Sequence, residues 1–162
     1  MPKTDVIDDL RAARSTLLDA INDLTDEQLL QPGAVGIWSV KDTLAHLAVW
    51  EAELVTALAR IEQQKRGIPR IMEIDEDIDE WNDEQYRQNA ARPLDSILAD
   101  FHGVHKYLIQ AVEALDDKVL DDNRQFEWME GEPLTYLILE TAVWHEEEHA
   151  ADILAWRDEQ EN

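Results

Sequence analysis

The sequence predicts an all-α protein of the four-helix bundle class, and three observations lead to this prediction. Four long segments carry apolar residues at steps of three and four, the spacing of one helix face. Patterns typical of strands are absent apart from short ambiguous pieces. None of the four segments is apolar on all sides, so we expect their apolar stripes to be buried against one another. We interpret residues 1–162 as one domain, because the chain contains no repeat and no low-complexity linker.

The first predicted helix runs from about Asp5 to Leu24. Directly after it, the residues from Thr25 to Gln28 have the pattern of a capping box, in which two side chains and two backbone amides bond reciprocally. We expect one short extra turn there, ended by the break at Gln31-Pro32-Gly33. The apolar positions of the long helix are Val6, Leu10, Ala13, Leu17, Ile21 and Leu24.

The second predicted helix begins after Ser39, a favourable N-cap with Asp42 three residues later. It is expected to continue to the stop at Gly67-Ile68-Pro69. The acidic stretch from Ile71 to Glu80 is predicted as a loop. The residues from Trp81 to Asn89 are predicted as a short helix that crosses one end of the bundle.

The third and fourth predicted helices each begin at a proline, which suits the first helical position because its missing amide hydrogen is not needed there. Pro93 opens the third helix, whose apolar face runs to Leu115. A break follows from Asp116 to Gly131, and the residues from Gln125 to Trp128 are predicted as a brief extended piece. Pro133 opens the fourth helix.

The fourth helix carries polar residues on the face that should be buried. Counting about 100° per residue from Leu134, the side chains of His145, Glu148, His149 and Asp152 all fall near the inward direction. Two imidazoles and two carboxylates in a core carry a large desolvation cost unless they bind an ion or one another. Two histidines one turn apart also present their rings to one point, as in zinc sites. A bound metal would satisfy these groups most directly, although hydrogen bonds among them would also do so and such a pair also occurs by chance in charged helices.

The same stretch spells the H-E-x-x-H pattern of zinc proteases, but a protease is not predicted. Such an enzyme needs a further ligand downstream, and position 155, where a third histidine would stand, is an alanine. By the same rotation Glu146 falls near 120°, at the margin of the buried face or outside it. We interpret Glu146 and Glu147 as a solvated face, and Glu148 as the glutamate with a functional role.

A third ligand must come from upstream, where three histidines remain. His46 lies at the edge of the apolar stripe of the second helix and fits either a pocket lip or a half-exposed residue beside a core tryptophan. His105 lies nearer the middle of the third stripe, so it is a core histidine, a third ligand or a pocket residue. His102 rotates outward and is interpreted as a surface residue.

Charge and composition exclude several classes of function. The formal net charge is −23, from 37 acidic and 14 basic residues, so we expect neither nucleic acid nor an anionic membrane surface as a partner. The absence of cysteine excludes disulfides and thiolate ligands. No stretch reaches eighteen consecutive apolar residues and no signal peptide is evident, so a cytoplasmic location is expected.

One segment resembles a known family motif. The residues from Gly36 to Leu47 resemble the GWSVKDxLAHL motif of the DinB/YfiT-like four-helix bundle proteins, and His145 and His149 match the closing H-x-x-x-H of that family. The middle of the chain resembles the ClbS/DfsB-like branch at Asn82 to Tyr86, Arg92 to Leu94, Ile97 to Leu115 and Gly131 to Leu134.

The resemblance implies a set of ligands and a range of activities. In this family the residues that match His46, His145 and His149 hold one divalent metal, most often zinc or nickel, and water completes its coordination. The wider family includes metal-dependent thiol transferases and isomerases, and the ClbS-like branch includes a resistance protein that hydrolyses an electrophilic genotoxin. Dimers are common in the family, so the resemblance implies a homodimer as one assembly.

These patterns lead to two hypotheses of function. The first is a metal-dependent hydrolase or thiol transferase that acts on a small electrophilic molecule, in which Glu148 and Asp152 orient a ligand or take a proton. Trp50, His105 and Trp144 are then expected to line the substrate pocket. The alternative is a non-catalytic protein, with or without a metal, that sequesters a reactive small molecule. The acidic insert between the two closing histidines argues against an anionic thiol such as glutathione.

Overall fold

The computed structural model describes residues 1–162 and confirms the all-α, four-helix bundle prediction. Its only β-type pairing is an isolated bridge between Val35 and Trp38. Three of the four long arms are single helices: α1 (Lys3–Ile21), α3 (Val40–Glu62) and α6 (Leu94–Glu113). The fourth arm consists of α8 (Leu134–Ile138), the π-helical segment η3 (Leu139–Trp144) and α9 (His145–Glu161).

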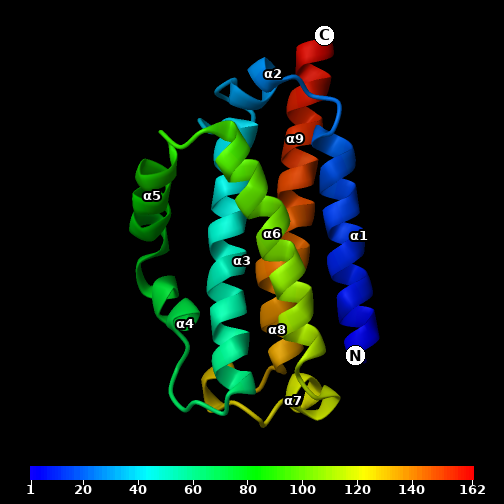
Figure 1. The fold of residues 1–162 in the computed structure, drawn as a ribbon, viewed down its shortest axis with the longest axis vertical. Helices are drawn as coiled ribbons and strands as arrows, with labels where there is room; N and C mark the ends of the chain where they lie inside the picture. The colour runs from blue at the N-terminus through cyan, green and yellow to red at the C-terminus, as the bar shows by residue number, and fades with distance from the viewer.

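The four arms do not alternate in direction. In the view of Figure 1, α1 and the fourth arm run upward, whereas α3 and α6 both run downward. Because α3 and α6 are parallel neighbours, the chain needs a long connection to return from the end of α3 to the start of α6. That connection supplies one wall of the site described below.

The connection is helical, so the prediction of a loop from Ile71 to Glu80 is wrong. It contains α4 (Arg70–Ile74), the 3-10 turn η1 (Asp75–Asp77) and α5 (Ile78–Asn89). Ile71 and Ile74 are buried in the core, so tertiary contacts order a segment whose acidic composition suggested solvent.

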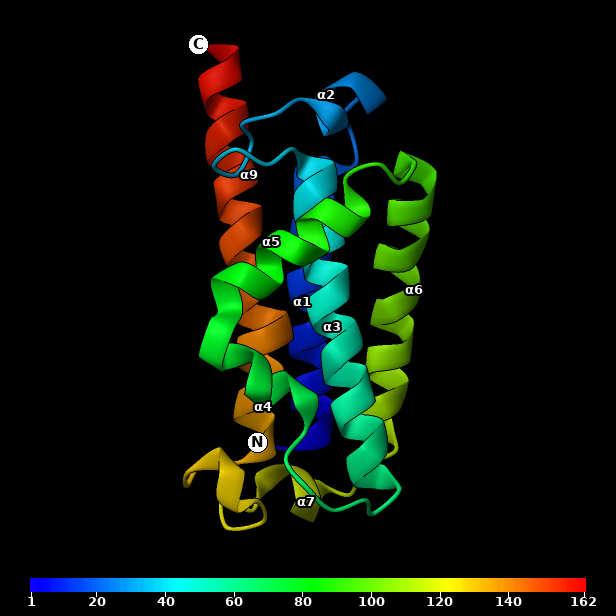
Figure 2. The same ribbon diagram turned by 90° about the vertical axis from the view of Figure 1, so that its left-hand side faces the viewer.

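The connection also lies elsewhere than predicted: it runs along the side of α3 rather than across an end of the bundle (Figure 2). The indole rings of Trp50 in α3 and Trp81 in α5 pack edge to face, with their centroids 4.8 Å apart. The indole nitrogen of Trp50 donates to the amide oxygen of Asn82 at 3.0 Å, and the ammonium of Lys41 donates to the carbonyl of Ala90 at 3.0 Å. Apolar and polar contacts together hold α5 against α3.

The predicted helix starts at the two capping boxes are confirmed. Thr25 and Gln28 cap the short helix α2 (Asp26–Leu30), and Ser39 and Asp42 cap α3. The break before the fourth arm contains α7 (Asp117–Asp121) and the 3-10 turn η2 (Glu127–Met129), so the extended piece predicted there is wrong. In so short a stretch, apolar residues two apart fit a tight turn as well as a strand.

The apolar core is divided into two clusters by a polar layer. One cluster surrounds the lower half of the bundle in Figure 1 and the other the upper half. Along each arm, the boundary between the clusters falls at a polar side chain that faces inward. These side chains are Arg14 of α1, Glu51 of α3, His105 of α6 and Glu146 of α9.

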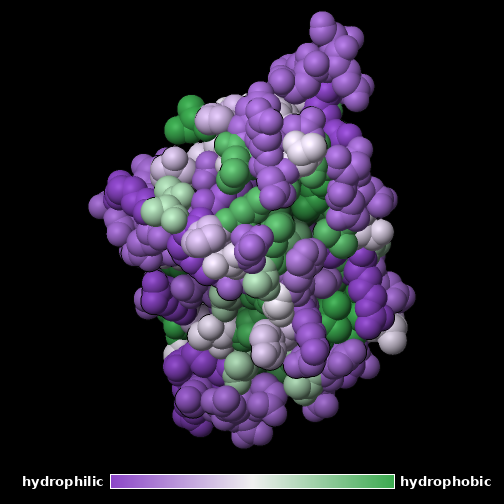
Figure 3. Space-filling view, turned by 45° about the horizontal axis from the view of Figure 1, so that its top comes forward, coloured by the Kyte–Doolittle hydropathy of each residue, from purple (hydrophilic) through white to green (hydrophobic).

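The surface is largely hydrophilic, as the net charge requires. On the face drawn in Figure 3, hydrophilic side chains surround a central band of exposed hydrophobic ones. None of the helices is both long and apolar enough to span a bilayer.

Candidate metal centre

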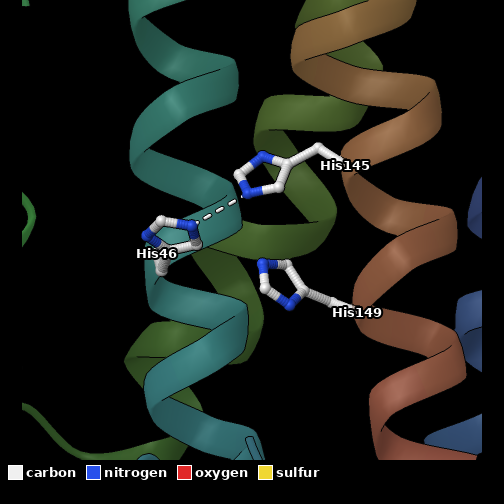
Figure 4. A group of neighbouring side chains, drawn as sticks. All are labelled: His46, His145 and His149. Carbon is white, nitrogen blue, oxygen red and sulfur yellow. Dashed lines mark hydrogen bonds between the residues drawn. The ribbon is translucent and has the colours of Figure 1, made fainter. Parts of the chain in front are cut away.

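Three histidines from two helices meet on the side of the bundle covered by α5. His46 comes from α3, and His145 and His149 lie one turn apart on α9 (Figure 4). One ring nitrogen from each histidine can be chosen so that all three atoms lie within 4.8 Å of one another. The Nε2 atoms of His46 and His145 are 2.9 Å apart. The fold therefore brings together residues that are 99 positions apart in the chain.

The π-helical segment η3 decides which side chains of α9 point where. A π turn contains one residue more than an α turn, so every residue after it is set back by about 100°. The uniform rotation that predicted Glu146 at the margin of the core therefore fails after Trp144. Glu146 is buried, and its predicted position on a solvated face is wrong. The setback turns His145 and His149 toward α3 and the cleft beside it.

Hydrogen bonds fix how two of the rings present their nitrogens. The Nδ1 of His145 lies 3.2 Å from the carbonyl oxygen of Thr141, and the Nδ1 of His149 lies 3.3 Å from Oδ2 of Asp152. Because both partners are acceptors, each Nδ1 carries the hydrogen, and each Nε2 is left with a free lone pair. This is the arrangement in which outer hydrogen bonds orient metal-binding histidines.

Burial keeps the rings of His46 and His145 neutral. It lowers the pKa of His46 to about 3, with the neighbouring rings of His145 and His149 adding to the shift. It also lowers the pKa of His145 to about 4, with a further contribution from His149. Metal ions bind the neutral imidazole, so burial removes the competition from protons at neutral pH for these two rings.

The donor set fits a small divalent cation. Two nitrogens bound to one tetrahedral zinc lie about 3.3 Å apart, given bonds of about 2.0–2.1 Å. The separation of 2.9 Å between His46 and His145 is close to this value, and a ring nitrogen of His149 lies within 4.8 Å of both. Three nitrogen ligands leave a fourth position for water or substrate, as in catalytic zinc sites.

The three histidines lie at an open cleft of about 850 Å³. Its walls come from α3, the connection α4–α5, the loop before α8, and the start of α9. Aromatic side chains contribute part of the lining: Trp50, Trp128 and Tyr136. A cleft of this size accommodates a drug-sized molecule.

The other predicted site residues divide into three groups. Trp50 and Glu148 line the cleft. Asp152 does not line it but accepts the hydrogen bond from His149. Trp144 and His105 do not line it: Trp144 is 44% exposed and packs against Tyr136, whereas His105 faces the polar layer of the core.

The polar layer is a buried ion cluster around Arg14, which the sequence reasoning missed. The guanidinium donates to Glu146 at 2.7 Å, to Glu51 at 3.0 Å and to the carbonyl of Phe101 at 2.9 Å, and it lies 3.7 Å from the centroid of the Phe101 ring. One side chain of α1 thus contacts α3, α6 and α9. A signal was present, because Arg14 follows Leu10 by four residues and precedes Leu17 by three, which places it on the apolar stripe.

The ion cluster holds more acid than Arg14 neutralises. Burial raises the pKa of Glu51, and burial together with the charge of Glu51 raises the pKa of Glu146 to about 7. Nδ1 of His105 and Oε1 of Glu51 face each other at 3.7 Å and have no hydrogen-bond partner. Glu51, His105 and Glu146 are spaced like metal ligands, but the guanidinium already supplies the cation between the two carboxylates. We therefore interpret this layer as structural.

Comparisons with known proteins agree with the geometry of the fold. A family model described as the DinB superfamily matches residues 9–153. A crystal structure of an uncharacterised protein from Escherichia coli UTI89 superimposes with a TM-score of 0.83 at 14% identity, covering 99% of this chain and 95% of that one.

A second solved structure, of the colibactin self-resistance protein ClbS in complex with double-stranded DNA, superimposes with a TM-score of 0.78 at 12% identity. It covers 96% of this chain and 95% of that one. A search of curated protein sequences found no match. Because a protein of this fold was crystallised with DNA, the acidic charge of this chain does not by itself exclude a nucleic-acid partner.

Proposed function

This chain belongs to the DinB superfamily, and on that premise we propose that it is a divalent-metal-dependent enzyme that hydrolyses a small electrophilic molecule or transfers a thiol to it. The observation that carries the proposal is the convergence of His46, His145 and His149 at an open cleft. Three imidazoles with an accessible fourth position are the donor set of a catalytic metal rather than of a closed structural one.

The proposed chemistry needs a nucleophile at neutral pH. A bound divalent ion supplies it by lowering the pKa of a coordinated water toward about 7, or by stabilising a thiolate. Asp152 holds the ring of His149 through Nδ1, and the carbonyl of Thr141 holds the ring of His145. Both bonds keep Nε2 directed at the common centre.

Glu148 is the carboxylate placed to move a proton. It lines the same cleft as the three histidines and lies one residue before His149. It has no ion-pair partner in the protein, so its carboxylate is free to accept a proton from a nucleophile and return it to a leaving group. Trp50 forms an apolar wall near this position and is held there by Asn82.

The solved relatives give limited support to the substrate class. ClbS is a colibactin self-resistance protein, so one protein of this fold serves in resistance. At 12% identity the likeness covers the fold and not the activity. We propose a reactive small molecule as the substrate class because the cleft has the volume for one.

The proposal is tested by the metal content of the purified protein together with turnover of an activated ester. We expect one equivalent of zinc or nickel in the wild type and loss of the ion in His149→Ala. His102→Ala is the matched control, since His102 is an exposed histidine of α6 outside the cleft. Glu148→Gln should keep the ion and lose turnover. Retention of a full equivalent of metal in His149→Ala would contradict the proposed ligand set.

One observation favours the non-catalytic alternative as the second candidate. Because Nδ1 of His145 carries its hydrogen, its Nε2 accepts a hydrogen bond from His46 at 2.9 Å, so these two rings satisfy each other without an ion. A binding protein that sequesters a small molecule would need only the cleft. Purified protein that binds small aromatic molecules without metal and without turnover would favour this candidate.

A further inference from the structure

The charge distribution around the three-histidine cleft narrows the class of substrate. Five acidic side chains line the cleft, and neither a lysine nor an arginine does. They come from four separate parts of the chain and so stand on several walls rather than on one helix. The five are Asp75 in η1, Glu130 and Glu132 in the loop before α8, Glu140 in η3 and Glu148 in α9.

These five carboxylates are not neutralised by the protein. None of them takes part in an ion pair with a lysine or arginine side chain. Carboxylates on facing walls of one concave site add their potentials, because the low-dielectric walls focus the field into the opening. The cleft is therefore a strongly negative site.

An acidic lining is not shared by every groove of the protein, although a groove beside α4 and α5 also has four acids to one base, Arg70. The groove between α3 and α6 is lined by one acid and one base, Asp100 and Arg92, which pair at 2.7 Å. Another groove near the end of α3 contains two acids and two bases: Glu53, Glu73, Arg60 and Arg70. In both grooves acids and bases are equal in number, whereas the histidine cleft has acids alone.

The cleft also offers aromatic surfaces that suit a cation. The side chains of Trp50, Trp128 and Tyr136 line it together with the carboxylates. The face of an indole or phenol ring attracts an ammonium or guanidinium group, and more strongly when the group is partly desolvated. A cleft lined by both aromatic rings and carboxylates suits an organic cation.

We propose that the substrate of this cleft is an organic cation, with an ammonium or guanidinium group on an apolar or aromatic body. The inference rests on the proposed function in one respect, since it takes the three-histidine cleft as the substrate site. A divalent ion on the histidines would add two positive charges against five carboxylates, so the cleft stays negative when loaded. Phosphorylated molecules and anionic thiols are repelled from the same opening.

The test compares three probes that share a benzene ring and a two-carbon chain: 2-phenylethylamine, 2-phenylethanol and phenylacetate. Binding to the full chain is followed by tryptophan fluorescence, because Trp50 and Trp128 line the cleft. We expect the amine to bind at least about tenfold more tightly than the alcohol at low salt, the acid to bind most weakly, and the preference to shrink at high salt. Equal affinity for amine and alcohol, or tighter binding of the acid, would overturn the proposal.

Variants that remove acidic charges test whether the preference for the amine arises in the cleft. Glu130→Gln/Glu132→Gln removes two charges from an exposed loop of the cleft and should lower the preference for the amine several-fold. Glu27→Gln/Glu159→Gln is the matched control, because it changes the net charge equally at exposed positions outside the cleft. An equal loss of preference in both double variants would assign the effect to overall charge and refute a selective cleft.

The same titrations separate this inference from the proposed function. They are repeated on metal-free protein and on His149→Ala, in which the carboxylates are unchanged. If no metal binds but the amine is still preferred, the metal-dependent function fails and the charge selectivity stands. If metal binds in the expected ratio and the amine is not preferred, the selectivity alone fails.

Discussion

The three-histidine cleft and the Arg14 ion cluster are built on the same two helices, yet they have opposite physical characters. His46 and Glu51 both belong to α3, and His145 and Glu146 are consecutive residues of α9. In the cluster the charges meet inside the protein: the side chains of Arg14, Glu51 and Glu146 are 6%, 1% and 1% exposed. At the cleft burial keeps His46 and His145 neutral, and the five carboxylates that line it have no ion-pair partner.

The difference shows how one helix can serve a structural site and a candidate functional site at once. Consecutive residues on an α-helix point about 100° apart, so His145 can face the cleft while Glu146 faces the core. The cluster bonds a side chain of α1 to α3, α6 and α9. It therefore holds together α3 and α9, the two helices that carry the histidines. The cleft, in contrast, leaves space beside the histidines for a bound molecule. Four experiments test this contrast between the ion cluster and the cleft.

The largest effect is expected from removal of the cation of the cluster. Arg14→Met leaves the carboxyl groups of Glu51 and Glu146 buried without a cation, so we expect a loss of about 3–5 kcal/mol in the free energy of unfolding. The measurement is denaturant unfolding. Arg87→Met, which breaks an exposed pair with Glu84, is the control and should cost less than about 1 kcal/mol. Similar losses in both variants would contradict a special role for the buried cluster.

A smaller gain in stability is expected when metal binds the cleft. At a zinc concentration of about 100 times Kd, binding to the folded state alone raises the free energy of unfolding by about 2.7 kcal/mol. The gain should vanish in His46→Ala and persist in His102→Ala. Thermal unfolding with and without zinc provides the measurement. A gain that survives loss of His46 would place the ion elsewhere.

The pH dependence of stability should reveal the buried acid pair. The pKa of Glu146 is raised from 4.5 to about 7, so between these values the folded state holds a proton that the unfolded chain releases. This contribution is complete below about pH 4.5 and is lost as the pH rises through 7, which amounts to about 3 kcal/mol at about 1.36 kcal/mol for each pKa unit. Relative to wild type, Glu146→Gln should therefore lack a decline in stability over this interval.

The contribution of His46 to stability changes with pH in the opposite direction and provides an internal check. Its pKa is lowered to about 3 from 6.5, so the unfolded chain binds the proton that the folded state excludes. Its contribution to stability is lost as the pH falls from about 6.5 toward 3. Subtracting the free energy of unfolding of Glu146→Gln from that of wild type at each pH leaves the contribution of Glu146. A difference profile that is flat between pH 4.5 and 7 would refute the raised pKa of the pair.

The smallest effect is expected at the outer hydrogen bond of the metal centre. Asp152→Asn keeps the shape of the side chain but removes the charge that holds Nδ1 of His149. We expect metal affinity to fall about tenfold, or about 1.4 kcal/mol, as for other outer partners of metal-binding histidines. Competition with a zinc chelator measures the change. Asp158→Asn, an exposed change of equal charge on α9, should leave the affinity unaltered.

Local sequence patterns were enough to predict the four helical arms and the residues at which they begin. The spacing of Leu10, Leu17 and similar residues is a local property, and so are the capping boxes at Thr25 and Ser39, which bond residues only three apart. The family motif around His46 and the pair His145 and His149 singled out the three residues that the fold brings together. Local patterns sufficed wherever the stabilising contacts were themselves local.

By contrast, which side chains of α9 face the cleft and which face the core depends on the tertiary structure. The π turn before His145 moves every later residue by about 100°, and no local pattern marked it. The burial of Glu146 depends on Arg14, 132 residues away, and the helices of the connection depend on burial of Ile71 and Ile74 against the bundle. Such contacts form between distant segments after the chain has folded, so periodicity along the chain carries no record of them.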